Sequence, residues 1–405
     1  MALDPLTLLF LFAATIIIGY FGLLVFEKTR ISDIIWLVLF GMLVGPVLHF
    51  VDSTLFAAIA PVIATIALLL ILFEAGLNME FYRLVRGFGR SMALAIACTA
   101  FSILAVGVVS TYLLNFSLLQ GMLLGAILGG TSSPIVITIV HGLRLPERTK
   151  TLLNLESILT DPLVVIVAIT IINFINQAGQ VSATQGILAA FSIGAVIGGL
   201  AGIAWLFALD RLKGRQFDYM LTLAVLFLIY AFAESNGGSG AIAALVFGLV
   251  LGNSTTFSSM LRFRKRFTVD STFKAFQAEI SFFIRSFFFV FLGIIFTVSQ
   301  EFIVYGLVIA AVLVLVRIAA VRLATLGNGF SALETNVIRV MAPRGLAAAV
   351  LAQYPLIFGI PDAGVFVGVV SVALMATVVY TTIAIRIVTG SAPAGKAIAK
   401  RAEGI

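Results

Sequence analysis

Charged side chains are scarce in this chain. Asp, Glu, Lys and Arg make up 11% of its 405 residues and hydrophobic residues 61%, and the mean hydropathy is +1.18. A soluble domain carries about 25% charged residues. The composition therefore excludes a soluble globular protein and indicates an all-α polytopic membrane protein.

Cysteine and histidine are also scarce. Cys98 is the single cysteine and lies in an apolar run, so no intrachain disulfide or thiolate metal cluster can form. His49 and His141 fall at the ends of apolar runs, whereas an intramembrane enzyme usually needs a catalytic pair or metal ligands at mid-depth. We therefore expect no enzyme and no cofactor.

A concentrated basic patch is missing as well. The formal net charge is +7, but Lys and Arg are spread over short loops between apolar stretches. This distribution is typical of residues that set membrane topology, and not of a surface that binds the phosphates of a nucleic acid. We expect the lipid bilayer as a partner and no nucleic acid.

Long apolar runs dominate the rest of the sequence. A crossing needs about 20 residues, and Lys and Arg occupy alternate loops, which places the N-terminus outside and the C-terminus in the cytoplasm of an inner or plasma membrane. The first run has no basic residue before it and is expected to remain as a span. The thirteen predicted spans are 6–26, 31–50, 55–79, 91–114, 119–141, 151–175, 184–209, 217–234, 239–253, 274–298, 302–325, 332–356 and 364–388.

Two of these spans are interrupted, and they are seven spans apart. The fifth is broken by Gly, Thr, Ser and Pro at 129–134, and the twelfth by Pro and Gly at 342–345. An odd offset reverses the direction of the second copy, so the sequence predicts two inverted six-helix repeats, joined by the seventh span. Paired interruptions of this kind indicate the midplane site of a secondary transporter.

The break in the fifth span offers oxygen atoms to an ion. One half-helix can end at the glycine pair, and the next can begin with Ser133 as N-cap and Pro134 at the first helical position. The freed carbonyls and the hydroxyls of Thr131, Ser132 and Ser133 suit Na⁺ or K⁺. The break alone also permits a structural kink whose hydroxyls bond nearby carbonyls.

Asp161 lies in the middle of the sixth span, where an isolated carboxylate costs about 2.5–3.5 kcal/mol. Burial favours its protonated form and a bound cation favours its ionised form, so one Asp can hold either, unless it only pairs with an arginine. We expect Asp161, Ser157 and Thr131 to be the metal ligands. The residues predicted to bind the ion or the proton are Asp161, Thr160, Ser157, Thr131, Ser132 and Ser133.

Other charges also fall within the spans. Glu156 and Arg344 are predicted to form an ion pair, because the repeat symmetry brings their spans together and either charge unpaired would be costly. Glu74, Arg285 and Arg317 are further intramembrane charges whose pairing the sequence leaves open.

With the polar break, the run from Glu156 to Pro162 and the Pro343-Arg344-Gly345 motif, the chain resembles the monovalent cation/proton antiporter superfamily, closest to its prokaryotic sodium/proton exchanger branch. The resemblance implies a homodimer in which a mobile core carries two crossing discontinuous helices beside Asp161. It also assigns the core ion pair to Glu156 and Arg344. The implied division is 1–90 (dimerisation-domain helices 1–3), 91–180 (core helices 4–6), 181–215 (linking helix 7), 216–300 (dimerisation-domain helices 8–10), 301–390 (core helices 11–13) and 391–405 (cytoplasmic tail).

The resemblance implies elevator-type exchange of Na⁺, or Li⁺, for protons. Two departures leave a K⁺/H⁺ antiporter open as the alternative, because many relatives have Asn-Asp at Thr160-Asp161 and Thr-Asp-Pro at Ser132-Ser133-Pro134. A single titrating Asp predicts electroneutral exchange of one cation for one proton. An ion channel is disfavoured, because it would have no use for a protonatable Asp between inverted broken helices.

Overall fold

The computed structural model describes residues 5–29, 32–51, 53–79, 89–176, 183–212, 218–260, 271–296, 299–325 and 329–390, and the predicted cytoplasmic tail lies outside them. Within these ranges all regular structure is helical, and each predicted span falls on a helix or a broken helix. The elements are α1 (Pro5–Thr29), α2 (Asp33–Met42) with its π-helical extension η1 (Leu43–Val47), α3 (Ser53–Asn78), α5 (Gly89–Leu113), α6 (Leu118–Ile127), α7 (Ser133–His141), α8 (Glu147–Asn176), α9 (Ala183–Leu212), α10 (Asp218–Ser235), α11 (Gly240–Gly252), α12 (Ser254–Met260), α13 (Ser271–Ile295), α14 (Gln300–Thr325), α15 (Ala332–Val340), α16 (Leu346–Leu351), α17 (Tyr354–Ile357) and α18 (Ala363–Thr389).

Several of these helices are long enough to cross a membrane. Seven of the described helices, α1, α5, α8, α9, α13, α14 and α18, are long and apolar enough to cross a bilayer. The other predicted spans correspond to shorter apolar helices or to helix pairs separated by a break. The architecture therefore fits the multi-pass membrane protein that the composition indicates.

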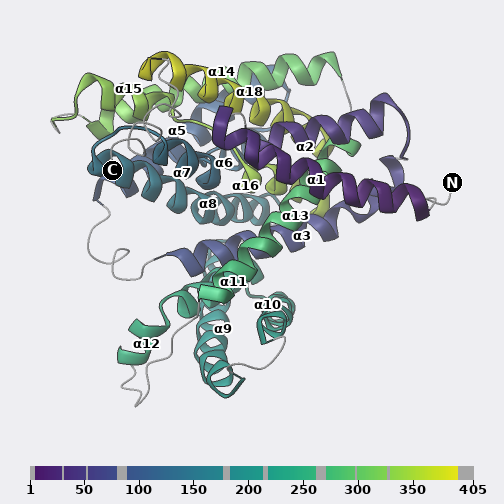
Figure 1. The fold of residues 1–405 in the computed structure, drawn as a ribbon, viewed down its shortest axis with the longest axis vertical. Coiled ribbons are helices and arrows are strands. Elements are labelled where there is room, and N and C mark those ends of the chain that lie inside the picture. Colours follow the sequence, from purple (N-terminus) through teal and green to yellow (C-terminus); the bar gives the residue numbers. More distant parts are fainter. Residues whose placement is uncertain are drawn as a thin grey trace, which may run out of the picture.

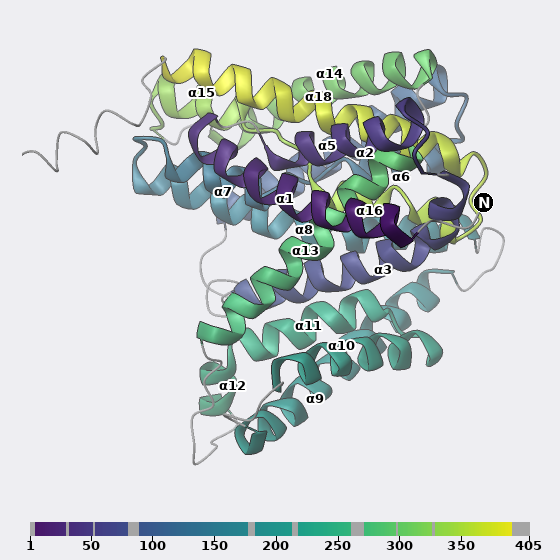
Figure 2. The same ribbon diagram turned by 45° about the vertical axis from the view of Figure 1, so that its right-hand side comes forward.

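The helices pack into a larger and a smaller group. Figure 1 shows α5 to α8 and α14 to α18 in the upper part, and α9 to α12 in the lower part. Helices α3 and α13 cross the space between the two groups, and Figure 2 shows α1 and α2 alongside the upper one. One buried apolar cluster fills the upper part, and a second joins α3 and α13 to α9, α10 and α11.

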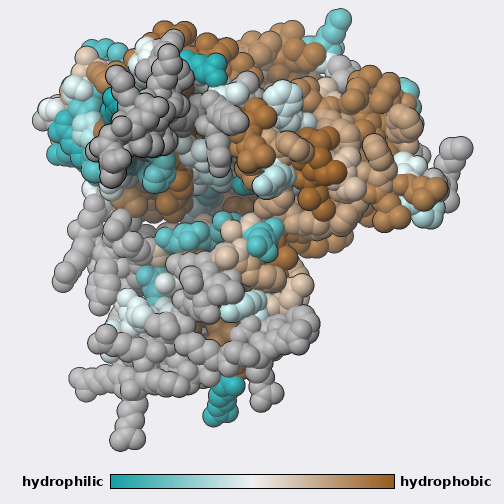
Figure 3. Space-filling view, viewed as in Figure 1, coloured by the Kyte–Doolittle hydropathy of each residue, from teal (hydrophilic) through white to brown (hydrophobic). Residues whose placement is uncertain are grey.

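The surface of α1 is strongly apolar. Hydrophobic residues cover the part of the molecule where α1 and α2 run (Figure 3). Leu6, Leu9, Phe10 and Phe21 are each more than half exposed. Contiguous apolar surface of this kind is typical of helices that contact lipid or another membrane-embedded surface.

Glycine lets α2 and α13 pack at backbone contact. A Cβ added to Gly41 would lie 2.0 Å from the carbonyl oxygen of Val290. A Cβ added to Gly293 would lie 2.3 Å from the carbonyl oxygen of Val38. Small residues at a helix interface are the usual means of tight packing in membranes. These two helices are therefore held at fixed separation and register.

The Gly41 contact yields a stability prediction. We expect Gly41→Val to lower the apparent melting temperature in detergent, because overpacking typically costs about 1–3 kcal/mol. Gly364→Val is the matched control, since a Cβ at Gly364 meets nothing within 4 Å. Equal melting temperatures for the two variants would contradict the close packing of α2 on α13.

Candidate functional site

The two interrupted spans are broken helices whose unwound segments cross. Residues 128–132 separate α6 from α7, and residues 341–345 separate α15 from α16. The Ser132 N–H donates to the Pro343 carbonyl across the crossing, at 2.8 Å. A Cβ at Gly345 would lie 2.3 Å from the Ser132 Oγ. The glycine therefore permits the close approach, and the predicted breaks are confirmed as helix interruptions.

The start of α7 differs from the sequence prediction by one residue. Ser132, and not Ser133, occupies the N-cap position, and Pro134 lies in the first turn. The Ser132 backbone is extended, with φ −72° and ψ 110°, and its N–H is already bonded to Pro343. This distant contact fixes where the helix begins, and it leaves the Ser133 side chain available for another partner.

That partner is Asp161 on α8. The Ser133 Oγ donates to the Asp161 Oδ2 at 2.7 Å, and both side chains are partly exposed. The carboxylate of Glu74, on α3, acts electrostatically on Asp161. Asp161 therefore has a neutral hydrogen-bond donor and an acidic neighbour, and no positively charged side chain among the described residues acts on it.

Thr131 and Thr160 form a separate buried cluster beside Glu156. The Thr131 N–H donates to the Thr160 Oγ1 at 3.1 Å, and the two hydroxyl oxygens lie 3.3 Å apart. The Thr131 hydroxyl also donates to the Glu156 Oε1 at 3.4 Å. Ser157 is buried on the same helix, and its hydroxyl donates to the Asn154 carbonyl at 3.0 Å. Thr131, Thr160 and Glu156 therefore hold the unwound segment against α8, whereas the Ser157 hydroxyl is bonded within its own helix.

The predicted partner of Glu156 is wrong. Glu156 accepts two hydrogen bonds from Arg317 on α14, at 2.5 and 2.9 Å, and both side chains are almost fully buried. Arg317 also donates to the Ile338 carbonyl, in the last turn of α15, at 3.0 Å. Because Arg317 lies on an unbroken helix beside this carbonyl, it can satisfy the carbonyl and the carboxylate together.

Arg344 has a different role from the one predicted. Its backbone N–H donates to the Thr377 Oγ1 at 3.2 Å, and its guanidinium donates to the Gly130 carbonyl in the other unwound segment. Its Nε is buried without a partner among the described residues. Arg344 thus binds the freed carbonyl at the crossing, where a cation is favoured by the end of a broken helix.

The remaining intramembrane charges also find partners. The Arg285 Nη2 lies 3.2 Å from the Asp33 Oδ2 at the start of α2. The Glu74 carboxylate lies beside Ser281 and within electrostatic reach of Arg285. Asp33 was not among the predicted site residues, although its acidic side chain follows Ser32 at the start of a predicted span, a pattern typical of a helix N-terminus.

A contact between α8 and α15 was also missed. The Arg148 side chain donates to both oxygens of Glu334, at 2.9 and 2.8 Å, and the Thr149 hydroxyl donates to Glu334 at 2.6 Å. Glu334 also accepts from the Ser331 N–H in a capping box at the start of α15. The Ser-x-x-Glu spacing at 331–334 predicts such a capping box, but its pairing with Arg148 depends on the fold.

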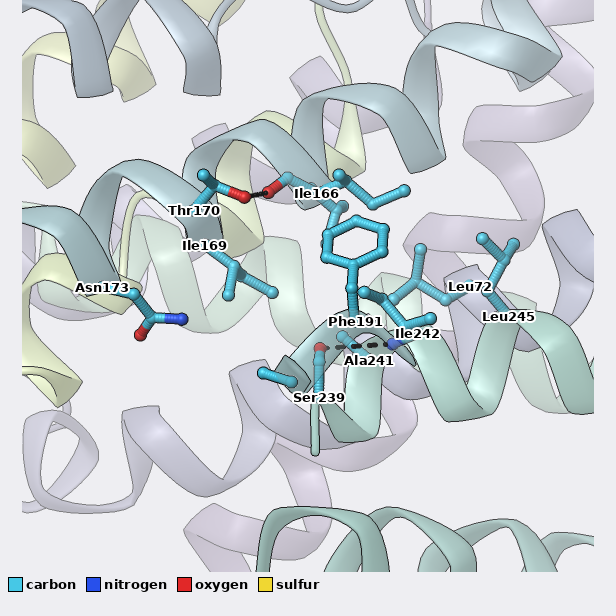
Figure 4. A pocket seen from close by; sticks show the side chains of 12 residues that line it. Leu72, Ile166, Ile169, Thr170, Asn173, Phe191, Ser239, Ala241, Ile242 and Leu245 are labelled. Carbon is cyan, nitrogen blue, oxygen red and sulfur yellow. Dashed lines mark hydrogen bonds between the residues drawn. The ribbon is translucent and has the colours of Figure 1, made fainter. Parts of the chain in front are cut away.

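An apolar cavity lies further along α8. Val165, one turn after Asp161, lines it together with Leu72 of α3 and Ile242 of α11. Figure 4 shows two polar groups at its edge turned to the backbone, the Thr170 hydroxyl, which donates to the Ile166 carbonyl, and Ser239, which accepts from the Ile242 N–H, while the Asn173 amide lies at the far end of the cavity. The cavity wall offers an ion little compensation for lost water.

Comparison with known proteins places this geometry in context. A family model described as "Sodium/hydrogen exchanger, transmembrane" matches residues 12–390. The K(+)/H(+) antiporter NhaP of Alkalimonas amylolytica is 27% identical over 332 residues, which cover 80% of this chain and 56% of that protein. The Na(+)/H(+) antiporter ApNhaP of Aphanothece halophytica is 31% identical over 258 residues, which cover 62% and 48%. This chain spans about half the length of these curated relatives.

A solved structure shares the fold. The sodium proton antiporter MjNhaP1 from Methanocaldococcus jannaschii superposes with a TM-score of 0.78 at 22% identity, covering 94% of this chain and 98% of that one. The family match is to transporters, in agreement with the expectation that the chain is not an enzyme. The all-helical membrane fold and the family resemblance are therefore confirmed.

The Glu156–Arg317 pair yields a second prediction. Glu156→Gln leaves a buried guanidinium without its counter-charge, which typically costs about 3–5 kcal/mol, so we expect a large fall in the apparent melting temperature in detergent. Glu147→Gln is the control, because Glu147 pairs with Lys150 at an exposed site and such pairs contribute little. Adding Arg317→Met to Glu156→Gln should recover part of the loss, and equal melting temperatures for the two Glu variants would refute the assignment.

Proposed function

This chain belongs to the sodium/hydrogen exchanger family, and from that premise we propose that it exchanges a monovalent cation for protons across a cell membrane. The observation that carries the proposal is the position of Asp161. Its carboxylate lies beside the crossing of two broken helices and accepts a hydrogen bond from Ser133. A channel or an enzyme would not need this arrangement.

The contrast between the two acidic residues of α8 supports Asp161 as the exchanging group. Glu156 is buried, and Arg317 donates to both of its oxygens, so its charge is compensated in every state of the cycle. Asp161 receives a neutral hydroxyl instead. A proton or a cation can therefore neutralise Asp161, and the two compete for the same oxygen atoms.

We propose that the cation binds between Asp161 and the hydroxyl of Ser133. Hydroxyl and carbonyl oxygens of the crossing would complete its coordination, and these are hard ligands for an alkali cation. Na⁺ is our first assignment, with Li⁺ as a substitute. The further proposed ligands are Thr131, Ser132, Ser157 and Thr160.

K⁺ is the second candidate. The site holds one carboxylate and several hydroxyls, and a weakly anionic site suits an ion that loses its water more easily. One relative is named a K(+)/H(+) antiporter and another a Na(+)/H(+) antiporter. The ion must therefore be measured.

The coupling of cation transport to proton transport follows from the free-energy cost of moving an unneutralised carboxylate past apolar surface. The apolar wall that includes Leu72, Val165 and Ile242 follows Asp161 along α8, and a bare charge facing it would lose most of its solvation. Only the proton-bound or cation-bound form would pass this wall cheaply. This supports an elevator in which α5–α8 and α14–α18 move against the remaining helices.

The remaining assignments also belong to this proposal. The N-terminus would lie outside and the C-terminus in the cytoplasm, because Lys and Arg occupy alternate loops. Two subunits would associate through surfaces that include the exposed apolar face of α1. The core and dimerisation domains would follow the division expected from the family resemblance.

The first functional test uses proteoliposomes with an imposed proton gradient. We expect Na⁺, Li⁺ or K⁺, but not choline, to dissipate the gradient through the wild-type protein, and Asp161→Asn to abolish the response. Ser133→Ala should raise the cation KM roughly tenfold, because it removes an oxygen ligand of the proposed site, an interaction comparable to a hydrogen bond with a charged group. Thr138→Ala, on the same half-helix but bonded to the Pro134 carbonyl, should match the wild type. Full activity in Asp161→Asn would refute the site.

The second test measures charge movement. One cation exchanged for one proton carries no net charge, so we expect cation jumps on supported membranes to produce no sustained current. The exchange rate should also be independent of an imposed membrane potential. A steady current that requires Asp161 would show unequal stoichiometry and overturn the electroneutral assignment.

A further inference from the structure

Arg285 lies between two acidic side chains that come from different helices. Its Nη2 is 3.2 Å from the Asp33 Oδ2 on α2. Glu74 on α3 is within its electrostatic reach on the other side. Helix α13, which carries Arg285, packs against both α2 and α3, as Figures 1 and 2 show. The position of this guanidinium therefore decides which carboxylate it neutralises.

Successive turns of α13 present a polar stripe towards α3. The Phe273 and Phe73 rings are in contact, with centroids 6.4 Å apart. One turn later, the Gln277 side-chain amide lies 3.4 Å from the Ser281 Oγ, and Ser281 lies beside Glu74. The next turn carries Arg285. Glu74 is thus contacted by a neutral hydroxyl while the guanidinium is held elsewhere.

Helix α3, which carries Glu74, also packs against α8, which carries Asp161. Leu72, on the same helix as Glu74, and Val165, one turn after Asp161, line one cavity, so α3 and α8 meet at this level. The Glu74 charge acts on Asp161. The charged groups therefore follow one another in the order Asp33, Arg285, Glu74 and Asp161.

Asp33 is well placed to retain Arg285. It is the first residue of α2, where the helix dipole stabilises a carboxylate, and it is buried. Its Oδ1 also accepts from the Ser32 hydroxyl at 3.2 Å. The Arg285 Nε is buried without a partner in the described part of the chain. The guanidinium thus retains unused hydrogen-bonding capacity and would turn to another carboxylate if Asp33 were neutral.

We propose that Asp33 is a positioning residue that holds Arg285 away from Glu74 and so keeps a net negative charge beside Asp161, which attracts the incoming cation. The proposal rests on the proposed exchange function and adds a residue outside the ion site to it. With Asp33, Arg285 and Glu74 ionised, the three charges sum to one negative charge. The cation therefore meets an anionic neighbour before it reaches Asp161.

The charge sum predicts an order of cation affinities. Asp33→Asn removes the net negative charge, and Arg285→Gln increases it to two. The double variant Asp33→Asn/Arg285→Gln restores the wild-type sum. At an effective dielectric constant near 20, one unit charge about 12 Å from the cation changes its affinity about tenfold. We expect the cation KM to rise about tenfold in Asp33→Asn, to fall in Arg285→Gln and to return near the wild-type value in the double variant.

The experiment measures initial exchange rates against cation concentration in proteoliposomes. The maximum rate should stay within about twofold of wild type in the three variants, because the charges act on cation binding and leave the moving parts intact. Glu279→Gln is the control, because this exposed residue of α13 carries the same charge without contacting Arg285. It should leave KM unchanged.

Substitution of Glu74 completes the test. Glu74→Gln alone should raise KM about as much as Asp33→Asn, because each change brings the sum of the three charges to zero, and the two together should raise KM further, because Arg285 is then left as an uncompensated positive charge. An unchanged KM in Asp33→Asn, or an Asp33→Asn/Arg285→Gln variant no better than Asp33→Asn, would overturn the proposal. A lowered KM in Arg285→Gln cannot come from damaged folding. Wild-type protein without cation-dependent exchange would instead overturn the proposed function.

Discussion

Backbone unwound inside a membrane must find hydrogen-bond partners within the protein, and this constraint organises the site. Here each unwound segment is satisfied by a distant part of the chain. The Ser132 N–H donates to Pro343, the Thr131 N–H donates to Thr160, and the Arg344 guanidinium donates to the carbonyl of Gly130. The two breaks therefore form one unit with α8, and neither could keep its geometry alone. The positions of the α7 start and of Ser133 follow from this crossing.

Two acidic residues little more than one turn apart on α8 have opposite roles for the same electrostatic reason. Glu156 is buried, and Arg317 compensates its charge while also binding the last turn of α15. The pair fixes three helices to one another. Asp161 is partly exposed and has a neutral donor in Ser133. Its charge must be compensated by something that arrives and leaves, which is what a transport site requires.

The sequence predicted the features that depend on local patterns. The breaks at Gly and Pro, the spans and the placing of Asp161 beside a hydroxyl-rich break follow from periodicity and from the cost of a carboxylate in hydrocarbon. Pairing was not predictable, because Arg317 and Arg344 are both buried arginines, and only the three-dimensional placement of α14 and of the unwound segment that carries Arg344 decides which one reaches Glu156. The N-cap of α7 was misplaced because it depends on Pro343, far away in sequence.

Most of the charged side chains discussed above cancel one another in pairs. The pairs Glu156 with Arg317 and Asp33 with Arg285 each sum to zero. Arg344, Glu74 and Asp161 then leave one net negative charge among these side chains. One proton or one alkali cation cancels it, and two cations would leave an excess positive charge inside the membrane, where an uncompensated charge is costly. The same charge balance supports the proposed exchange of one cation for one proton.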